Sequence, residues 1–315
     1  MDPLALLLDS LDVTLPVFVM VFVGYLLRRT RMVDHRFVTT ASHLVFHGSM
    51  PVMIFLSIIA ADLDATLNPR MLGFFAIATL ASFLLSWGWA HRRVAVADRS
   101  ACIQGAFRGN CGIVGLALAA GMYGDAGLST GGLLLGVVIL TYNAFSVIAL
   151  THYQAGHHGA WRNVLGHILR NPLILAVLTA LPLAAMNLSL PGWLEASGSY
   201  FASLTLPLAL LCVGATLSLR ALKRSGWITV ETSLIKMVAI PVLATGSAWL
   251  VGFEGRELGV MFLFFASPTA AAAFVMAKAM GGNAVLTANI IALTTLMASV
   301  TITLGAFGLQ MIGVI

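Results

Sequence analysis

The chain has 315 residues, of which 59% are hydrophobic and only 9% are charged. Its mean hydropathy of +0.97 and its shortage of charge exclude a soluble globular domain, which carries about 25% charged residues. The formal net charge of +5 does not indicate nucleic-acid binding, because the basic residues are scattered and lack interleaved aromatic residues. The composition therefore indicates an integral membrane protein.

A membrane-spanning helix needs about 20 mostly apolar residues, and the sequence contains ten such segments. In chain order they are residues 11–28, 37–60, 71–90, 101–123, 128–150, 172–189, 197–219, 227–251, 256–280 and 284–309. We therefore expect an all-α integral membrane protein with ten transmembrane helices.

Basic residues gather in alternate loops between these segments. They follow the first, third, fifth and seventh segments and end the ninth: Arg28, Arg29, Arg31, Arg36, Arg92, Arg93, Arg99, Arg162, Arg170, Arg220, Lys223, Arg224 and Lys278. The opposite loops contain only Arg70 and Arg256. Because loops rich in lysine and arginine stay in the cytoplasm, we expect both termini outside and residues 151–171 to form a cytoplasmic linker.

Two pairs of stretches repeat at nearly the same offset. The segment SMPVMIFLSIIAADL aligns with TLPLALLCVGATLSL, with Pro51 on Pro207, an offset of 156. The segment GMYGDAGLST aligns with AMGGNAVLTA, with Asp125 on Asn283, an offset of 158. The agreement indicates a repeated unit of five predicted helices.

The repeat divides the chain into two halves, residues 1–150 and residues 172–315, joined by the linker. Since each half has an odd number of helices, the second enters the membrane in the opposite direction. Inverted repeats of this kind are typical of secondary transporters, whose binding site lies at the midplane between the halves.

Helix-breaking residues interrupt the fourth and ninth predicted helices. The fourth contains QGAFRGNCGI, with Gly109, Asn110 and Gly112 in its middle, and the offset aligns Asn110 with Pro268 in FFASPTAAAAF. Ser267 before Pro268 is expected to be a helix N-cap followed by a proline at the first helical position, and Asn110 is expected to cap in the same way. Unwound backbone at membrane depth is tolerated only around a cavity or inside protein. The N-termini of the half-helices would suit an anion there.

Four stretches carry a resemblance to a known family: LPVFVMVFVGYLLRR, LVFHGSMPVMIFLSI, FRGNCGIVGLALAAGMYG and ASPTAAAAFVMAKAMGGN. The sequence resembles the auxin efflux carrier family, which includes bacterial carboxylate permeases and plant auxin exporters. The resemblance implies an inverted-repeat fold with broken crossover helices 4 and 9, like that of bile-acid symporters and sodium/proton antiporters. It also implies that Asn110 lies at the substrate carboxylate, and it suggests malonate- or malate-like substrates and a homodimer. Many plant members carry a second crossover asparagine, where this chain has Ser267, Pro268 and Thr269.

Two cations lie within the predicted helices, where charge is costly and often functional. Arg108 is expected either to snorkel to the cytoplasmic interface or to serve an anion site or gate. Lys236 is expected either to contact the substrate or carry a coupling proton, or to pair structurally with Glu231. Asn143 is expected to join helices or to line a cavity.

Histidines and prolines supply the remaining candidates. His43 and His47 share a helix face and are expected to be structural, to line the substrate path and sense protons, or to bind a metal, although no third ligand is evident. Pro51 and Pro207 are expected to kink their helices.

No aspartate or glutamate lies at the centre of a predicted helix, so an anionic ligand is favoured over a cation. We expect a secondary active transporter of a small organic anion, a mono- or dicarboxylate, in a bacterial inner membrane. H⁺ or Na⁺ is the expected coupling ion, and no cofactor, metal or nucleic acid is expected. A non-transporting receptor for a carboxylate is the alternative. The absence of HExxH and P-loop motifs argues against a metallopeptidase-type enzyme and against built-in ATP hydrolysis.

Overall fold

The computed structural model describes residues 3–60, 68–153, 172–186, 190–217 and 226–315, and apart from one isolated β-bridge its elements are helical. The α-helices are α1 Pro3–Arg29, α2 His35–Leu44, α3 Met50–Ile59, α5 Pro69–Arg93, α6 Val96–Phe107, α7 Leu116–Tyr153, α9 Pro172–Ala185, α10 Gly192–Ser203, α11 Thr205–Thr216, α13 Trp227–Leu234, α14 Ile240–Leu250, α15 Gly255–Ala266, α16 Ala272–Ala279 and α17 Ala284–Met311. Three π-helical turns join some of them: η1 Val45–Ser49, η2 Cys111–Gly115 and η3 Ile235–Ala239.

In the described part of the chain, seven helical stretches are long and apolar enough to cross a membrane. The prediction of an all-helical, multi-span protein is therefore confirmed. The number is below ten for two reasons. The fourth and fifth predicted helices share the 43-residue stretch Cys111–Tyr153, and the sixth and ninth correspond to the shorter helices α9, α15 and α16.

Helix α7 is two helices joined at a sharp kink. Gly124 has φ 58° and ψ −142°, a conformation that glycine adopts readily and other residues rarely do. A methyl group at Gly127 would lie 2.1 Å from the carbonyl oxygen of Ala119, eight residues earlier. Eight residues of straight helix rise about 12 Å, so the second arm folds back along the first. This hairpin separates the fourth and fifth predicted helices.

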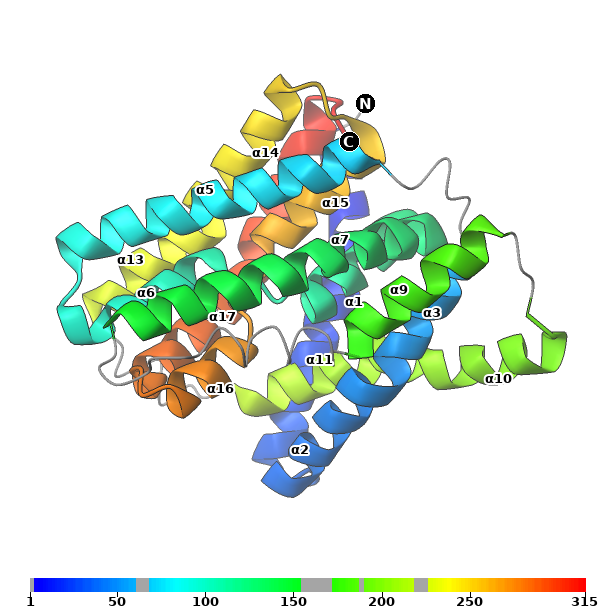
Figure 1. Ribbon diagram of the computed structural model, residues 1–315, viewed down its shortest axis with the longest axis horizontal. Coiled ribbons are helices and arrows are strands. Elements are labelled where there is room, and N and C mark those ends of the chain that lie inside the picture. The colour runs from blue at the N-terminus through cyan, green and yellow to red at the C-terminus, as the bar shows by residue number, and fades with distance from the viewer. Residues whose placement is uncertain (1–2, 61–67, 154–171, 187–189, 218–225) are drawn as a thin grey trace.

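The helices pack in two groups. Helix α1 lies along α11, and α3 lies along α9. Figure 1 shows α2, α3, α10 and α11 in the lower part of the view and α5, α13 and α14 toward the upper left, with α7 between them. The α1–α11 contact depends on Gly24 and Gly214, where an added methyl group would meet backbone carbonyl oxygens at 2.1 Å and 1.8 Å.

Asparagine side chains begin two of the long helices and tie them to the broken ones. Asn68 caps α5 by accepting from the Met71 N–H, and its amide donates to Glu257 in the first turn of α15 at 2.8 Å. Asn283 caps α17 in the same manner, and its amide donates to Asp98 in the first turn of α6 at 2.7 Å. The outer ends of both broken helices are therefore fixed to neighbouring helices.

The two ends of the chain lie together. Ser10 near the start of α1 donates to Gln310 near the end of α17 at 2.7 Å, and the hydroxyls of Thr14 and Thr303 lie 2.7 Å apart. Figure 1 shows both termini at the same end of the molecule. Two termini on the same side of the molecule agree with an even number of membrane crossings. The expectation that this side is external stays a prediction.

Both prolines predicted to kink their helices follow an irregular turn. Pro51 is the second residue after the π-helical turn η1, and Pro207 lies three residues after the break between α10 and α11 at Leu204. The predicted linker, residues 151–171, lies outside the described residues from residue 154 onward. The basic residues Arg162, Arg170, Arg220, Lys223 and Arg224 also lie outside them.

Candidate functional site

The breaks in the fourth and ninth predicted helices lie against each other. Helix α6 ends at Phe107 and α15 ends at Ala266, and the links that follow pair through one antiparallel β-bridge between Gly109 and Thr269. The Asn110 N–H donates to the Pro268 carbonyl at 2.7 Å, and the Ala270 N–H donates to the Arg108 carbonyl at 3.1 Å. Each unwound link thereby supplies hydrogen-bond partners for backbone groups of the other link, inside a protein that is otherwise helical. We call these residues, 108–110 and 267–271, the paired links.

The expectation that Ser267 and Pro268 begin a helix is wrong. Ser267 is the C-cap of α15, with φ −58° and ψ 138°, and its hydroxyl donates back to the Leu263 carbonyl at 2.8 Å. The next helix, α16, begins only at Ala272. The physical reason is that a proline disfavours the helical conformation of the residue before it. The Pro268 carbonyl is instead used for pairing with the other link.

Asn110 precedes η2 as expected, but its side chain forms no capping hydrogen bond. Its carbonyl accepts from the N–H groups of Ile113, Val114 and Gly115 at 3.0–3.3 Å, so the backbone alone starts this turn. Asn110, Gly112 and Ile113 are partly exposed, while residues 100–109 and 114–119 are buried. The Asn110 amide is therefore unused by the helix and lies where the buried helix opens.

Lys236 lies on η3, next to Gly109 in the link that follows α6. Its side chain is 0% exposed, and Nζ donates to the Phe265 carbonyl at the end of α15 at 2.8 Å. A methyl group at Gly109 would lie 3.2 Å from Nζ. A cation at the C-terminal end of a helix interacts favourably with the helix dipole. The alternative of a structural pair between Lys236 and Glu231 is not formed; Glu231 pairs with Arg93 at 3.1 Å instead.

Arg108 turns its guanidinium into the protein, away from the surface. The residue is 7% exposed, and Nη1 donates to the Ser146 hydroxyl at 2.8 Å. Nη2 donates to Asn143 Oδ1 at 2.9 Å, and Nη1 also lies 3.1 Å from Met276 Sδ on α16. Among the described residues neither Arg108 nor Lys236 forms an ion pair. Arg108, within the paired links, and Lys236, beside them, therefore have only neutral partners among the described residues.

Hydroxyl groups complete the site. Thr269 Oγ1 donates to the Gly105 carbonyl at 2.6 Å, and the Thr269 N–H donates to Thr294 Oγ1 at 3.1 Å. Sequence reasoning missed Thr294 and Ser146. Ser146 lies one helical turn after Asn143, and this spacing places both side chains on the same helix face. The spacing could therefore have identified Ser146 as a second partner in the site. Thr294 offered none, since hydroxyl residues are scattered throughout these apolar helices.

His43 and His47 are not brought to the paired links. Both are exposed, and their rings stack with centroids 4.0 Å apart. The π-helical turn η1 contains His47, whose Nδ1 lies 3.3 Å from the His43 carbonyl oxygen. Within the described residues no group of three or more histidine, cysteine or acidic side chains is arranged to hold a metal ion.

The sequence matches the family described as "Membrane transport protein" over residues 11–156 and 157–305. This chain belongs to that family. The transporter is 24% identical to an "Uncharacterized transporter" of Methanothermobacter thermautotrophicus, over 94% of this chain and 97% of the relative. It is 23% identical to one of Methanocaldococcus jannaschii, over 93% and 97%, and 22% identical to the "Uncharacterized transporter YfdV" of Escherichia coli K12, over 84% and 86%. The membrane-spanning helices and these relatives identify a membrane transporter rather than an enzyme.

Proposed function

We propose that the transporter moves a small organic anion, a mono- or dicarboxylate such as malonate or malate, through a site at the paired links. The observation that carries this proposal is the environment of Arg108. Its guanidinium is almost fully buried, and its described partners, among them Asn143 and Ser146, are all neutral. A buried charge without a counter-charge is strongly unfavourable. An anionic substrate would supply that counter-charge.

The groups around Arg108 suit a carboxylate. The Asn110 amide and the backbone at Gly112 are partly exposed at the start of a helical segment, where N–H groups favour an anion. Arg108 and Asn143 extend the polar surface toward α7. A guanidinium can donate two parallel hydrogen bonds to one carboxylate. Lys236 adds a second positive charge on the far side of Gly109.

Two inverted five-helix halves, residues 1–150 and 172–315, are part of the proposal. Their support is the pattern of helix packing. Exchanging the halves converts the α1–α11 pair into the α3–α9 pair, if α1 and α3 correspond to α9 and α11. The same exchange converts the packing of α6 on α17 into that of α15 on α7. In such transporters, one group of helices rocks against the other around a central site.

Alternating access would then follow from motion of the helices that carry the paired links, α5–α7 and α13–α17, against α1–α3 and α9–α11. We place the protein in an inner membrane with both termini outside, in agreement with the positive-inside rule. For coupling we favour H⁺, carried by Lys236, because its ammonium is fully buried beside Gly109 and forms no ion pair with a described carboxylate. Na⁺ is the alternative coupling ion.

The experiment that tests this function is uptake of labelled malonate into proteoliposomes. Unlabelled malate, succinate, lactate and indole-3-acetate serve as competitors. Saturable uptake that some of these acids inhibit supports an organic-anion carrier. Tight binding of one acid without flux would identify a receptor instead. If neither flux nor binding is observed, the organic anions tested are excluded as substrates.

A further inference from the structure

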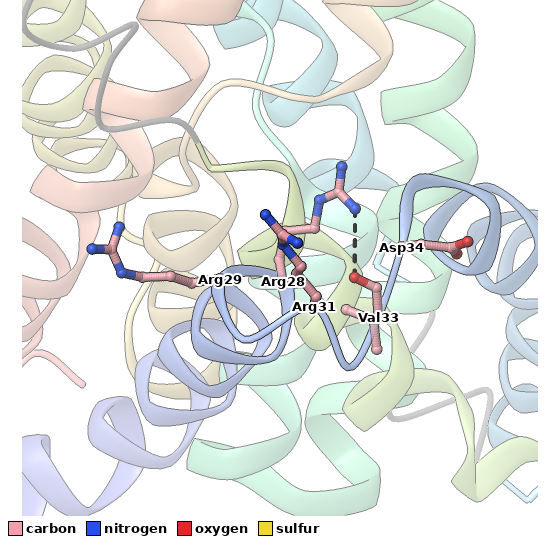
Figure 2. A pocket seen from close by; sticks show the side chains of 5 residues that line it. All are labelled: Arg28, Arg29, Arg31, Val33 and Asp34. Atoms are coloured by element: carbon pink, nitrogen blue, oxygen red, sulfur yellow. Dashed lines mark hydrogen bonds between the residues drawn. The ribbon is translucent and has the colours of Figure 1, made fainter.

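Three arginines surround a hollow at the end of α1, far along the sequence from the paired links. Arg28 and Arg29 are the last two residues of α1, Arg31 follows in the turn, and Val33 and Asp34 complete the lining. The hollow measures about 460 Å³, which is within the range of small-ligand sites. Figure 2 shows Arg28 and Arg31 on the same side of the turn, while Arg29 extends away from them. We call this feature the arginine hollow.

The positive charge of the arginine hollow is not neutralised. All three arginines are exposed, and none forms an ion pair with a described carboxylate. Arg28 Nη1 donates only one hydrogen bond, to the Val33 carbonyl at 3.4 Å (Figure 2). The single acidic residue, Asp34, uses Oδ1 to accept from the Phe37 N–H at 2.7 Å and so caps α2. The hollow therefore offers guanidinium donors to an anion.

Arg31 occupies a backbone position that favours glycine. Its N–H donates to the Arg28 carbonyl at 3.3 Å, and the Met32 N–H donates to the Leu27 carbonyl at 3.0 Å. These bonds form a Schellman motif, whose left-handed residue is usually glycine. Arg31 has φ 62°, the only non-glycine residue with positive φ in the described chain. The chain thus places a guanidinium where a glycine would relax the backbone.

The surroundings of the hollow indicate the source of the anion. The candidate membrane span Ser10–Arg29 ends at the hollow, so the arginines lie at the level where lipid headgroups begin. Met32 and Phe37, next to it in the chain, are 75% and 44% exposed, and Phe22 and Leu26 on α1 are exposed as well. Cations beside exposed apolar side chains match a molecule with a phosphate head and acyl chains.

We propose that the arginine hollow binds the phosphate of an anionic phospholipid headgroup at the membrane surface. Arg28 and Arg31 donate to the phosphate oxygens, since the guanidinium fork matches phosphate geometry. Arg29 contributes positive potential from the other side of the turn. Binding of this lipid anchors the end of α1 and the turn to α2 at the interface.

The test measures lipid retention by the full-length protein. The protein is delipidated in neutral detergent and titrated with phosphatidylglycerol or phosphatidylcholine, and bound lipid is counted by native mass spectrometry. Arg28→Gln with Arg31→Gly is the test variant. Arg36→Gln is the matched control, because Arg36 is an exposed cation of the same region that does not line the hollow.

We expect the wild type to retain phosphatidylglycerol in preference to phosphatidylcholine. The double variant should lose about tenfold in apparent affinity, and Arg36→Gln should stay within about twofold. Arg31→Gly alone should raise the unfolding temperature in lipid-free detergent while weakening retention, which separates lipid binding from folding. Equal retention of both lipids, or an equal loss in Arg36→Gln, would overturn the proposal. Displacement of the lipid by inorganic phosphate at equal concentration would assign the hollow to a soluble phosphate and would also overturn it.

Discussion

Gly109 and Thr269 lie 160 positions apart in the sequence and pair as an antiparallel bridge where α6 and α15 have ended. Each link supplies backbone partners to the other, so two interruptions that would be costly separately become mutually supporting. The pairing uses only backbone atoms of the two links, so the Asn110 amide and the Arg108 guanidinium take no part in it. It is the structural basis of the proposed anion site.

Asn110→Ala is expected to abolish transport while preserving the fold. The Asn110 side chain forms no capping hydrogen bond, so its removal leaves the backbone of η2 intact. Initial uptake rates in proteoliposomes and the unfolding temperature in detergent measure the two effects. Thr141→Val, which removes a polar group on α7 that bonds only to its own helix, should retain normal uptake. Uptake at the wild-type rate in Asn110→Ala would remove this residue from the site.

Arg108→Met is expected to lower transport by about 100-fold, the loss that corresponds to a charge-assisted contact of about 3 kcal/mol. Its unfolding temperature should be unchanged or higher, since an apolar side chain relieves a buried charge without a counter-charge. Arg108→Lys keeps the charge and should retain part of the activity. Arg92→Met, at an exposed position, is the control. A large drop in stability together with normal specific activity would assign Arg108 a structural role.

Lys236→Met is expected to remove the response of uptake to an imposed pH gradient. The Lys236 ammonium is fully buried and lies 3.2 Å from where a methyl group on Gly109 would be, and its exchangeable proton would be lost with the substitution. Uptake is measured with and without an acidic exterior in sodium-free buffer. Lys278→Met, an exposed lysine on α16, should respond as the wild type does. A retained pH response in Lys236→Met would exclude Lys236 as the proton carrier.

Gly214→Ala is expected to prevent or severely weaken the packing of α1 on α11. The added methyl group would lie 1.8 Å from the Val21 carbonyl oxygen, so two backbones would have to separate. Gly136→Ala in α7 meets nothing within 4 Å and should stabilise its helix by about 1 kcal/mol. Thermal unfolding in detergent distinguishes the pair, and equal unfolding temperatures would contradict the close contact.

Much of this architecture was predictable from the sequence. Hydropathy located the helical segments, and Gly109, Asn110 and Pro268 located the breaks, because these residue types disfavour continuous helix. The register of the second break was not predicted correctly. The Ser267–Pro268 pattern predicts the start of a helix, whereas Pro268 acts on Ser267 and ends the helix before it.

The partners of the polar side chains were less predictable. The direction of Arg108 depends on how α7 folds back at Gly124, and this arrangement is set by tertiary packing. The exposure of His47 likewise depends on which face of its helix the other helices cover. Sequence periodicity predicts neither the direction of the Arg108 side chain nor the exposure of His47, since apolar residues cover nearly all faces of these helices.

The most direct test of the central claim is counterflow of labelled malonate into proteoliposomes preloaded with unlabelled malonate, for the wild type and for Asn110→Ala. A carrier with a site at the paired links predicts transient accumulation of label in wild-type vesicles and none in the variant. Equal accumulation in both, or no counterflow of any tested acid in the wild type, would contradict it.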